Sequence, residues 1–151
     1  MSYTSGEALV LTRLRAISGS TWTSSNSSRG NWSILNSGAS DHYAILAMAP
    51  GTNDGYAISM TLRNYVTKIE VWQAYTDDGT SYTNLLGYYE AILDMFDQYR
   101  KLGDTGGTIQ DARCARWGQV EERWSAGGGP RWLKQDFFIE WTEENSISYA
   151  E

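Results

Sequence analysis

The sequence predicts an α+β domain, in which two helices cover one side of an antiparallel sheet of four to five strands. Three observations lead to this prediction: a long amphipathic helix near the middle, alternating segments before and after it, and short connections that favour antiparallel pairing. The predicted element order is α-β-β-(β)-α-β-β. At 151 residues, the chain fits a single domain over residues 1–151.

A first helix is predicted over residues 5–18. Thr4 and Glu7 have the spacing of a capping box, which marks a helix start. The apolar stripe is formed by Val10, Leu14 and Ile17. A glycine at position 19 ends the segment.

Residues 18–40 show no lasting periodicity and are rich in Ser, Asn and Gly. They predict one long loop, which is unusual in length for a compact domain. The loop carries two tryptophans, Trp22 and Trp32, and a purely solvated linker has little use for indoles. We therefore expect contacts with another chain to order this segment.

Two or three strands follow the loop. Residues 41–49 predict a strand that ends at Pro50 and Gly51, and residues 52–55 predict a hairpin turn because they contain Asp-Gly. Residues 56–75 alternate, but the alternation changes phase at residues 63–64. Such a change predicts a bulge within one long strand, or a break between two strands.

The central helix is predicted over residues 81–102. Ser81 or Thr83 would cap it, and Gly103 would end it. Apolar residues recur at steps of four and three along one stripe, with two leucines expected to widen it. The stripe is Leu85, Tyr89, Ile92, Phe96 and Tyr99, and the widening residues are Leu86 and Leu93.

Two more strands, residues 108–118 and 131–142, are expected after this helix, with a glycine-rich turn over residues 127–130 between them. In the last strand, one face is almost entirely apolar and should pack on the helices. Its residues are Leu133, Phe137, Ile139 and Trp141. The remaining residues, 143–151, form a short acidic tail that should fray.

The composition of the chain argues against several classes of function. The net charge is −6 and the sequence pI is about 4.7, which argues against binding nucleic acid through phosphate neutralisation. The single cysteine, Cys114, allows no internal disulfide. Neither a signal peptide nor a membrane span is predicted, so we expect synthesis in the cytoplasm and no membrane partner.

The sequence contains no strong candidate for a catalytic residue. His42 is the only histidine, and its neighbour Asp41 should point to the opposite face of a strand, so the two do not form a ready dyad. Cys114 has no activating partner nearby in sequence and is more typical of a small buried residue. No cofactor site, metal site or phosphate-binding loop is predicted, because the glycine-rich pieces lack the lysine and hydroxyl residues of a Walker A motif. An enzyme is therefore disfavoured.

Four segments carry a resemblance to a known family. They are residues 11–14 (Leu-Thr-Arg-Leu), 65–72, 88–94 (Tyr-Tyr-Glu-Ala-Ile-Leu-Asp) and 138–141 (Phe-Ile-Glu-Trp). In this order, with the variable loop after the first helix, the chain resembles the tail terminator, or tail-completion, proteins of long-tailed bacteriophages. The resemblance covers residues 5–142 and rests on element order and pattern.

The resemblance implies a structural virion protein that forms a hexameric ring on the last ring of the tail tube. Such a ring stops tube growth and joins the tail to the head-completion or neck proteins, so the protein would reside in the virion at the neck. The implied partners are further copies of the chain, the tail tube protein and a neck protein. DNA would pass through the lumen without specific binding. The resemblance implies no catalytic residues.

We further expect an acidic chain to suit a channel that must not hold phosphates. Because a ring subunit needs two different contact faces, the irregular segments are the candidates for subunit or partner contacts. The predicted contact residues are Trp22, Trp32, Pro50, Gly51, Asn53 and Asp54. The alternatives are another neck or tail component, such as a head–tail connector or tube subunit, and a small enzyme or ligand-binding domain with a pocket beside His42 or Cys114.

Overall fold

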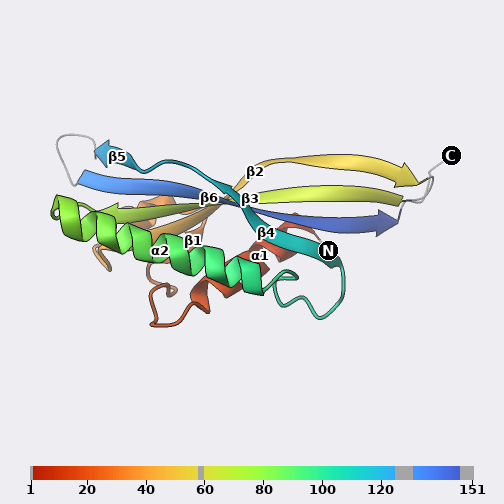
Figure 1. Cartoon of the computed structure of the whole chain (residues 1–151), viewed down its shortest axis with the longest axis horizontal. Coiled ribbons are helices and arrows are strands. Elements are labelled where there is room, and N and C mark those ends of the chain that lie inside the picture. Colours follow the sequence, from red (N-terminus) through yellow and green to blue (C-terminus); the bar gives the residue numbers. More distant parts are fainter. Residues whose placement is uncertain (1, 58–59, 125–130, 147–151) are drawn as a thin grey trace.

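A computed structural model describes residues 2–57, 60–124 and 131–146. Its strands form one mixed six-stranded sheet in the order β1-β2-β3-β6-β4, and β5 also pairs with β6 (Figure 1). The elements are α1 (Tyr3–Arg15), β1 (Ser27–Arg29), the 3-10 helix η1 (Trp32–Asn36), β2 (His42–Ala57), β3 (Met60–Ala74), α2 (Asp78–Gln98), β4 (Ile109–Trp117), β5 (Glu121–Trp124) and β6 (Arg131–Ser146).

The predicted α+β class is confirmed, and both helices lie on the same face of the sheet (Figure 1). The sheet is larger than predicted, and it is not wholly antiparallel. β1 pairs with β2 in parallel, through Ser27, Ser28 and Arg29, within the segment predicted to be a loop. β1 and β5 are three and four residues long and mostly polar, so neither shows an alternation that sequence reasoning could find.

α1 begins earlier than predicted. The Ser2 side chain caps it by accepting a hydrogen bond from the Ser5 backbone N–H. The predicted capping box is wrong, because the Glu7 carboxylate instead accepts from Tyr3 Oη at 2.6 Å and Arg29 Nε at 2.7 Å. The bond from Arg29 joins β1 to α1 across the segment that was predicted to be a loop.

Of the predicted stripe, Leu85, Ile92 and Phe96 are fully or almost fully buried and Tyr89 is half-buried, whereas Tyr99 lies beyond the end of α2. The prediction that Leu86 widens the buried stripe is wrong, because this residue is 43% exposed. The helix starts at Asp78, and the Asp77 carboxylate accepts from the Thr80 backbone N–H at 2.8 Å. It ends at Gln98, before the predicted Gly103.

β2 continues to Ala57, so the predicted strand end at Pro50 and Gly51 and the predicted turn at residues 52–55 are both wrong. A register shift between Ala49 and Thr52 forms a bulge in which Gly51 packs against β3. A Cβ at Gly51 would lie 2.1 Å from the Asn64 carbonyl oxygen, so only glycine fits there. β3 itself pairs with β6 without a register shift. The phase change at residues 63–64 therefore reflects apolar residues on the other face of β3, opposite the bulge.

β6 extends to Ser146, so the predicted tail contributes four residues to the sheet, and residues 147–151 lie outside the described residues. The predicted apolar face of β6 is confirmed, with Phe137, Ile139 and Trp141 fully buried. Two register shifts in β4 break its strict alternation. The expected glycine-rich turn at residues 127–130 also lies outside the described residues.

The middle strands project beyond the helices (Figure 1). We call this projection the arm; it comprises residues 52–57 of β2, 60–64 of β3 and 142–146 of β6. The core lies in the remainder of the molecule, the body. Its largest buried side chains include Trp22, Trp141 and Phe137. The body fixes the strands, and the arm presents their ends.

Candidate assembly surfaces

His42 corrects a prediction made from strand alternation. Its Nδ1 lies 2.6 Å from Asp41 Oδ1, and its Nε2 lies 2.8 Å from the Thr21 carbonyl oxygen. The pair forms because Asp41 precedes β2, so the alternation of a strand does not fix where its side chain points. The hydrogen bond to His42 lowers the pKa of Asp41. Both imidazole nitrogens are thus engaged within the protein, which leaves neither directed at a substrate.

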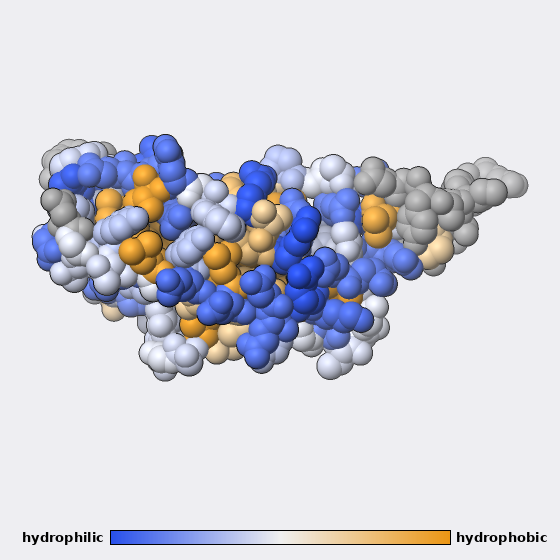
Figure 2. Space-filling view, viewed as in Figure 1, coloured by the Kyte–Doolittle hydropathy of each residue, from blue (hydrophilic) through white to orange (hydrophobic). Residues whose placement is uncertain are grey.

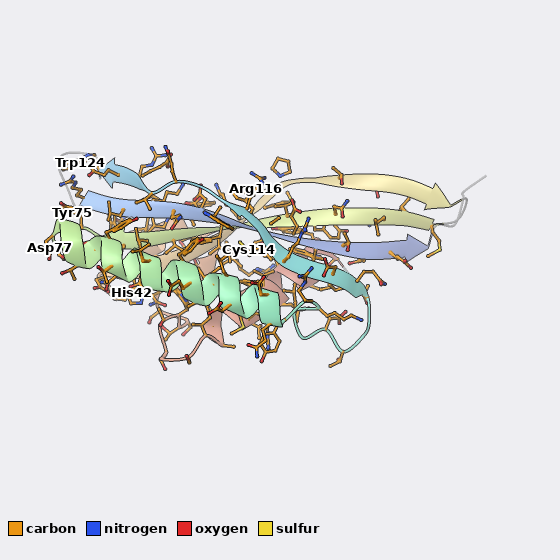
Figure 3. The ribbon with its side chains drawn as sticks, in the orientation of Figure 1. His42, Tyr75, Asp77, Cys114, Arg116 and Trp124 are labelled. Carbon is orange, nitrogen blue, oxygen red and sulfur yellow. The ribbon has the colours of Figure 1, made fainter. Side chains whose placement is uncertain are left out.

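Cys114 lies in the middle of β4, as labelled in Figure 3, and is half-buried. Burial raises the pKa of its thiol to about 11, so the thiol is protonated and a poor nucleophile at neutral pH. Within residues 2–57, 60–124 and 131–146, no group of three His, Cys, Asp or Glu residues could hold a metal ion.

The two predicted contact tryptophans have different environments. Trp22 is 2% exposed, and its ring packs 5.2 Å from His42 and 5.1 Å from Tyr88, centroid to centroid. It is a core residue, so it offers almost no surface to a partner, and the prediction for it is corrected. Trp32 is 45% exposed and donates a hydrogen bond from Nε1 to Glu70 at 3.1 Å. It remains a candidate contact.

The other four predicted residues, Pro50, Gly51, Asn53 and Asp54, all lie in β2. Gly51 and Asn53 line a hollow of about 260 Å³ where the arm leaves the body, together with Tyr3, Met48 and Tyr65. We call it the arm-base hollow. Its lining is mainly apolar. Met48 at its rim is 71% exposed, the largest exposure among the large apolar side chains described.

The outer edge of β2 is largely open. β1 pairs only with Ala44, Ile45 and Leu46, and among the described residues no strand lies beside residues 47–57 on that edge. At the opposite side of the sheet, β4 also has an outer edge that no described strand covers. The sequence missed this feature because it predicted that the strand ends at residue 49.

A network of charges occupies the sheet face away from the helices. The Glu70 carboxylate lies 2.9 Å from Lys68 Nζ and 3.7 Å from Lys134 Nζ. Burial raises the pKa of Glu70, but the hydrogen bonds from Lys68 and Trp32 together with the charges of Lys134 and Lys68 outweigh it, so the pKa is lowered overall. Lys134 also lies 3.2 Å from Asp136. This face therefore carries both signs of charge.

Another exposed feature lies at the end of the molecule opposite the arm. The Arg131 guanidinium stacks 3.9 Å from the Tyr75 ring and 5.0 Å from the Trp124 ring. Trp124 is 66% exposed, and Figure 3 places it with Tyr75 near Asp77 at the start of α2. Sequence reasoning could not find this cluster, because residues 75, 124 and 131 meet only through strand pairing.

Apolar surface also lies beside α2. Leu86 is 43% exposed, and Trp117 of β4 is 48% exposed while its ring packs 5.3 Å from Tyr89. Figure 2 shows apolar residues scattered among polar ones on the half of the molecule that holds α2. Exposed aromatic and arginine residues of this kind are enriched in protein–protein interfaces.

No family model matches this chain, and no curated protein matches it. Neither α1 nor α2 is long and apolar enough to cross a membrane, which holds for the residues that the structure describes. The functional argument therefore rests on surface geometry.

Proposed function

We propose that this protein is a structural subunit of a phage virion, a tail terminator that assembles into a ring on the tail tube. One observation carries the proposal: the two ends and the two sheet edges of the molecule present unlike surfaces. The arm with its hollow lies at one end, and the Tyr75–Arg131–Trp124 stack lies at the other. Unlike surfaces that fit each other give head-to-tail contacts, which form a ring where the rotation between subunits closes and a filament where it does not.

Further support comes from the lack of a catalytic arrangement at the two candidate positions. The ring nitrogens of His42 are engaged, and the Cys114 thiol has a raised pKa. Trp22 and Tyr88, whose rings pack on His42, line a hollow to which the histidine itself does not contribute. This arrangement favours an assembly role over the enzyme alternative.

The proposed ring also suggests a role for the exposed acidic residues of α2. Glu90, Asp94 and Asp97 are exposed on α2, and their spacing puts them on one side of the helix. In our proposal this side faces the lumen, where its charge keeps DNA from binding. Replacing all three with lysine should slow DNA ejection from assembled phage. Ejection at the unchanged rate would contradict a lumenal position.

A tail tube subunit is the second candidate, because free sheet edges also suit a subunit that stacks into long tubes. The two functions differ in where growth stops. A terminator forms one ring, and a tube subunit continues to polymerise.

Electron microscopy of the purified protein tests the proposal, with the protein alone and mixed with phage tail tubes that lack a terminator. We expect single rings, free in solution or on one end of each tube, and tubes of fixed length. Long tubes formed by the protein alone would identify a tube subunit. A monomer that leaves tube ends bare would overturn the assembly proposal.

A further inference from the structure

We propose that the outer edge of β2, residues 47–57, binds the β4 edge of a second copy of this chain by strand addition. This inference rests on the ring proposed above and specifies the contact that closes it. The result is one sheet that continues from subunit to subunit.

The first argument is the state of the β2 edge. The Ala44 N–H donates to the Asn26 carbonyl, and the Leu46 carbonyl accepts from the Gly30 N–H, so both residues direct their backbone groups toward β1. Backbone direction alternates along a strand, which directs the N–H and C=O of Met48 toward the same outer edge. No described strand receives them.

The second argument is that this edge lacks the usual protection. Exposed edge strands are commonly blocked by lysines or other charges. Residues 47–57 include one charged residue, Asp54, and no lysine or arginine. Register shifts between Ala49 and Thr52 and between Gly55 and Ala57 interrupt the edge, while residues 47–49 and 52–55 stay in register with β3. These two segments remain accessible for pairing.

The third argument is the arm-base hollow beside the edge. Strand addition combines backbone hydrogen bonds, which supply affinity, with pockets that select alternate side chains of the added strand. The hollow, with Met48 at its rim and Tyr3 and Tyr65 in its lining, is such a pocket. Its apolar lining fits an apolar or aromatic side chain.

The position and charge of β4 favour it as the added strand. β4 carries Arg113 and Arg116; Arg113 lies 4.0 Å from Glu140, and Asp111 forms a bidentate pair with Arg100 at 2.8 and 2.9 Å. Arg116 therefore leaves β4 net positive, and residues 47–53 of β2 carry no charge that would repel it. Pairing of β2 with β2 would use the same edge twice and close a dimer, which leaves no edge for a ring. Because β2 and β4 bound opposite sides of one sheet, their pairing is head-to-tail and can close a ring.

Cysteine pairs on matched faces test this pairing. In the sheet, Ala49 pairs with Val66, Val66 with Glu140 and Glu140 with Arg113, so Ala49 and Arg113 share the face away from the helices. In a Cys114→Ser background, we expect Ala49→Cys combined with Arg113→Cys or Arg116→Cys to form disulfides between subunits on mild oxidation. Because every subunit would carry both halves of the bond, the product on a non-reducing gel is a ladder that ends at a covalent ring.

The matched control combines Met48→Cys with Arg113→Cys in the same background. Met48 lies on the opposite face of the sheet from Arg113, because Met48 pairs with Thr67, Thr67 with Ile139 and Ile139 with Cys114. We expect its cross-linking to be at least tenfold slower. Equal rates for matched and mismatched pairs would overturn the proposal. Efficient cross-linking of the single variant Ala49→Cys would also overturn it, by showing β2–β2 pairing.

A charge substitution gives a second, independent readout. Met48→Lys places a charge on the open edge, and because Met48 is 71% exposed, the monomer should keep its melting temperature. We expect the concentration needed for assembly, measured by mass photometry, to rise at least tenfold. Tyr82→Lys, at a 49% exposed position on α2, is the control and should leave assembly unchanged. An unchanged assembly of Met48→Lys would overturn the proposal.

The tests separate this inference from the proposed function. Rings seen by microscopy without matched cross-links would overturn β2–β4 pairing and leave the terminator proposal standing. Protein that forms neither rings nor cross-links would overturn both.

Discussion

The body and the arm are built from the same three strands, yet they differ in what covers them. In the body, the helices bury Ile69 and Phe137 completely on one face, and Ile45 is completely buried on the other. In the arm, Arg63 and Glu144 on those same strands are exposed. The difference shows that strand pairing alone carries the chain outward, whereas helix cover supplies the stability. One continuous sheet can therefore anchor a fold and present a surface.

Trp141 joins the two regions, and its replacement should have the largest effect. Its indole is fully buried, 5.6 Å from the rings of both Tyr3 and Tyr65. Trp141→Ala should lower the free energy of unfolding by about 3–5 kcal/mol, measured by urea denaturation. Trp124→Ala, at a 66% exposed site, should change it by less than about 0.5 kcal/mol. Similar losses for both variants would mean that the junction does not hold the arm to the body.

Alanine substitutions at two helix glycines, one at the junction of body and arm and one away from it, should change stability in opposite directions. A Cβ at Gly6 of α1 would lie 2.5 Å from Trp141 Cζ2, whereas a Cβ at Gly87 of α2 would meet no atom within 4 Å. Alanine favours a helix over glycine by about 0.8–1.0 kcal/mol, so Gly87→Ala should raise the melting temperature. Gly6→Ala should lower it, because forcing atoms into a packed site costs about 1–3 kcal/mol. A stabilised Gly6→Ala variant would show that α1 does not press on the junction.

The charge network on the face of the body away from α1 and α2 predicts a pH dependence of stability. Since the pKa of Glu70 is lowered by folding from its ordinary value of 4.5, its contribution to stability is fully present above that pH. The contribution is lost as pH falls through the lowered pKa. Between pH 6 and pH 3, Glu70→Gln should therefore lose less stability than the unsubstituted protein in thermal melts. Glu144→Gln, in the exposed arm, is the control and should follow the unsubstituted profile.

The smallest effect on global stability should come from Gly51→Ala. A Cβ there would meet the Asn64 carbonyl at 2.1 Å, so the bulge must open, but few buried groups depend on it. We expect faster hydrogen exchange at residues 52–55 and little change at residues 66–73, which the body protects. Accelerated exchange throughout the sheet would show that the arm and the body unfold as one unit.

Local pattern was enough to predict the parts of the fold that have a strong period. The stripe of α2 and the apolar face of β6 follow directly from residues such as Ile92 and Phe137. Short elements were missed, because β1 and β5 exist through pairing with longer strands. The arm was cut short in the prediction, since Pro50 and the Asp-Gly pair resemble a turn. Pairing with β3 holds these residues in a strand and overrides their local preference for a turn.

The candidate surfaces were less predictable than the fold. A tryptophan in a polar segment could face a partner or the core, and Trp22 enters the core by packing on His42 and Tyr88. The exposure of Met48 could not be predicted from the sequence, because it depends on how far α1 extends over the sheet. The stack of Arg131 between two rings depends on contacts across strands. Such surfaces are properties of the assembled sheet.

The pairing of β3 with β6 has a mechanical consequence. The two strands run in unbroken register from Met60 with Ser146 to Ala74 with Trp132, a length of roughly 50 Å at about 3.4 Å per residue. A continuous ladder resists sliding, because every hydrogen bond along it would have to shift together. A load on the arm is therefore transmitted to the far end of the molecule, beside Tyr75 and Arg131. This strand pair therefore acts as a stiff beam that is held to the helices where Trp141 packs on α1.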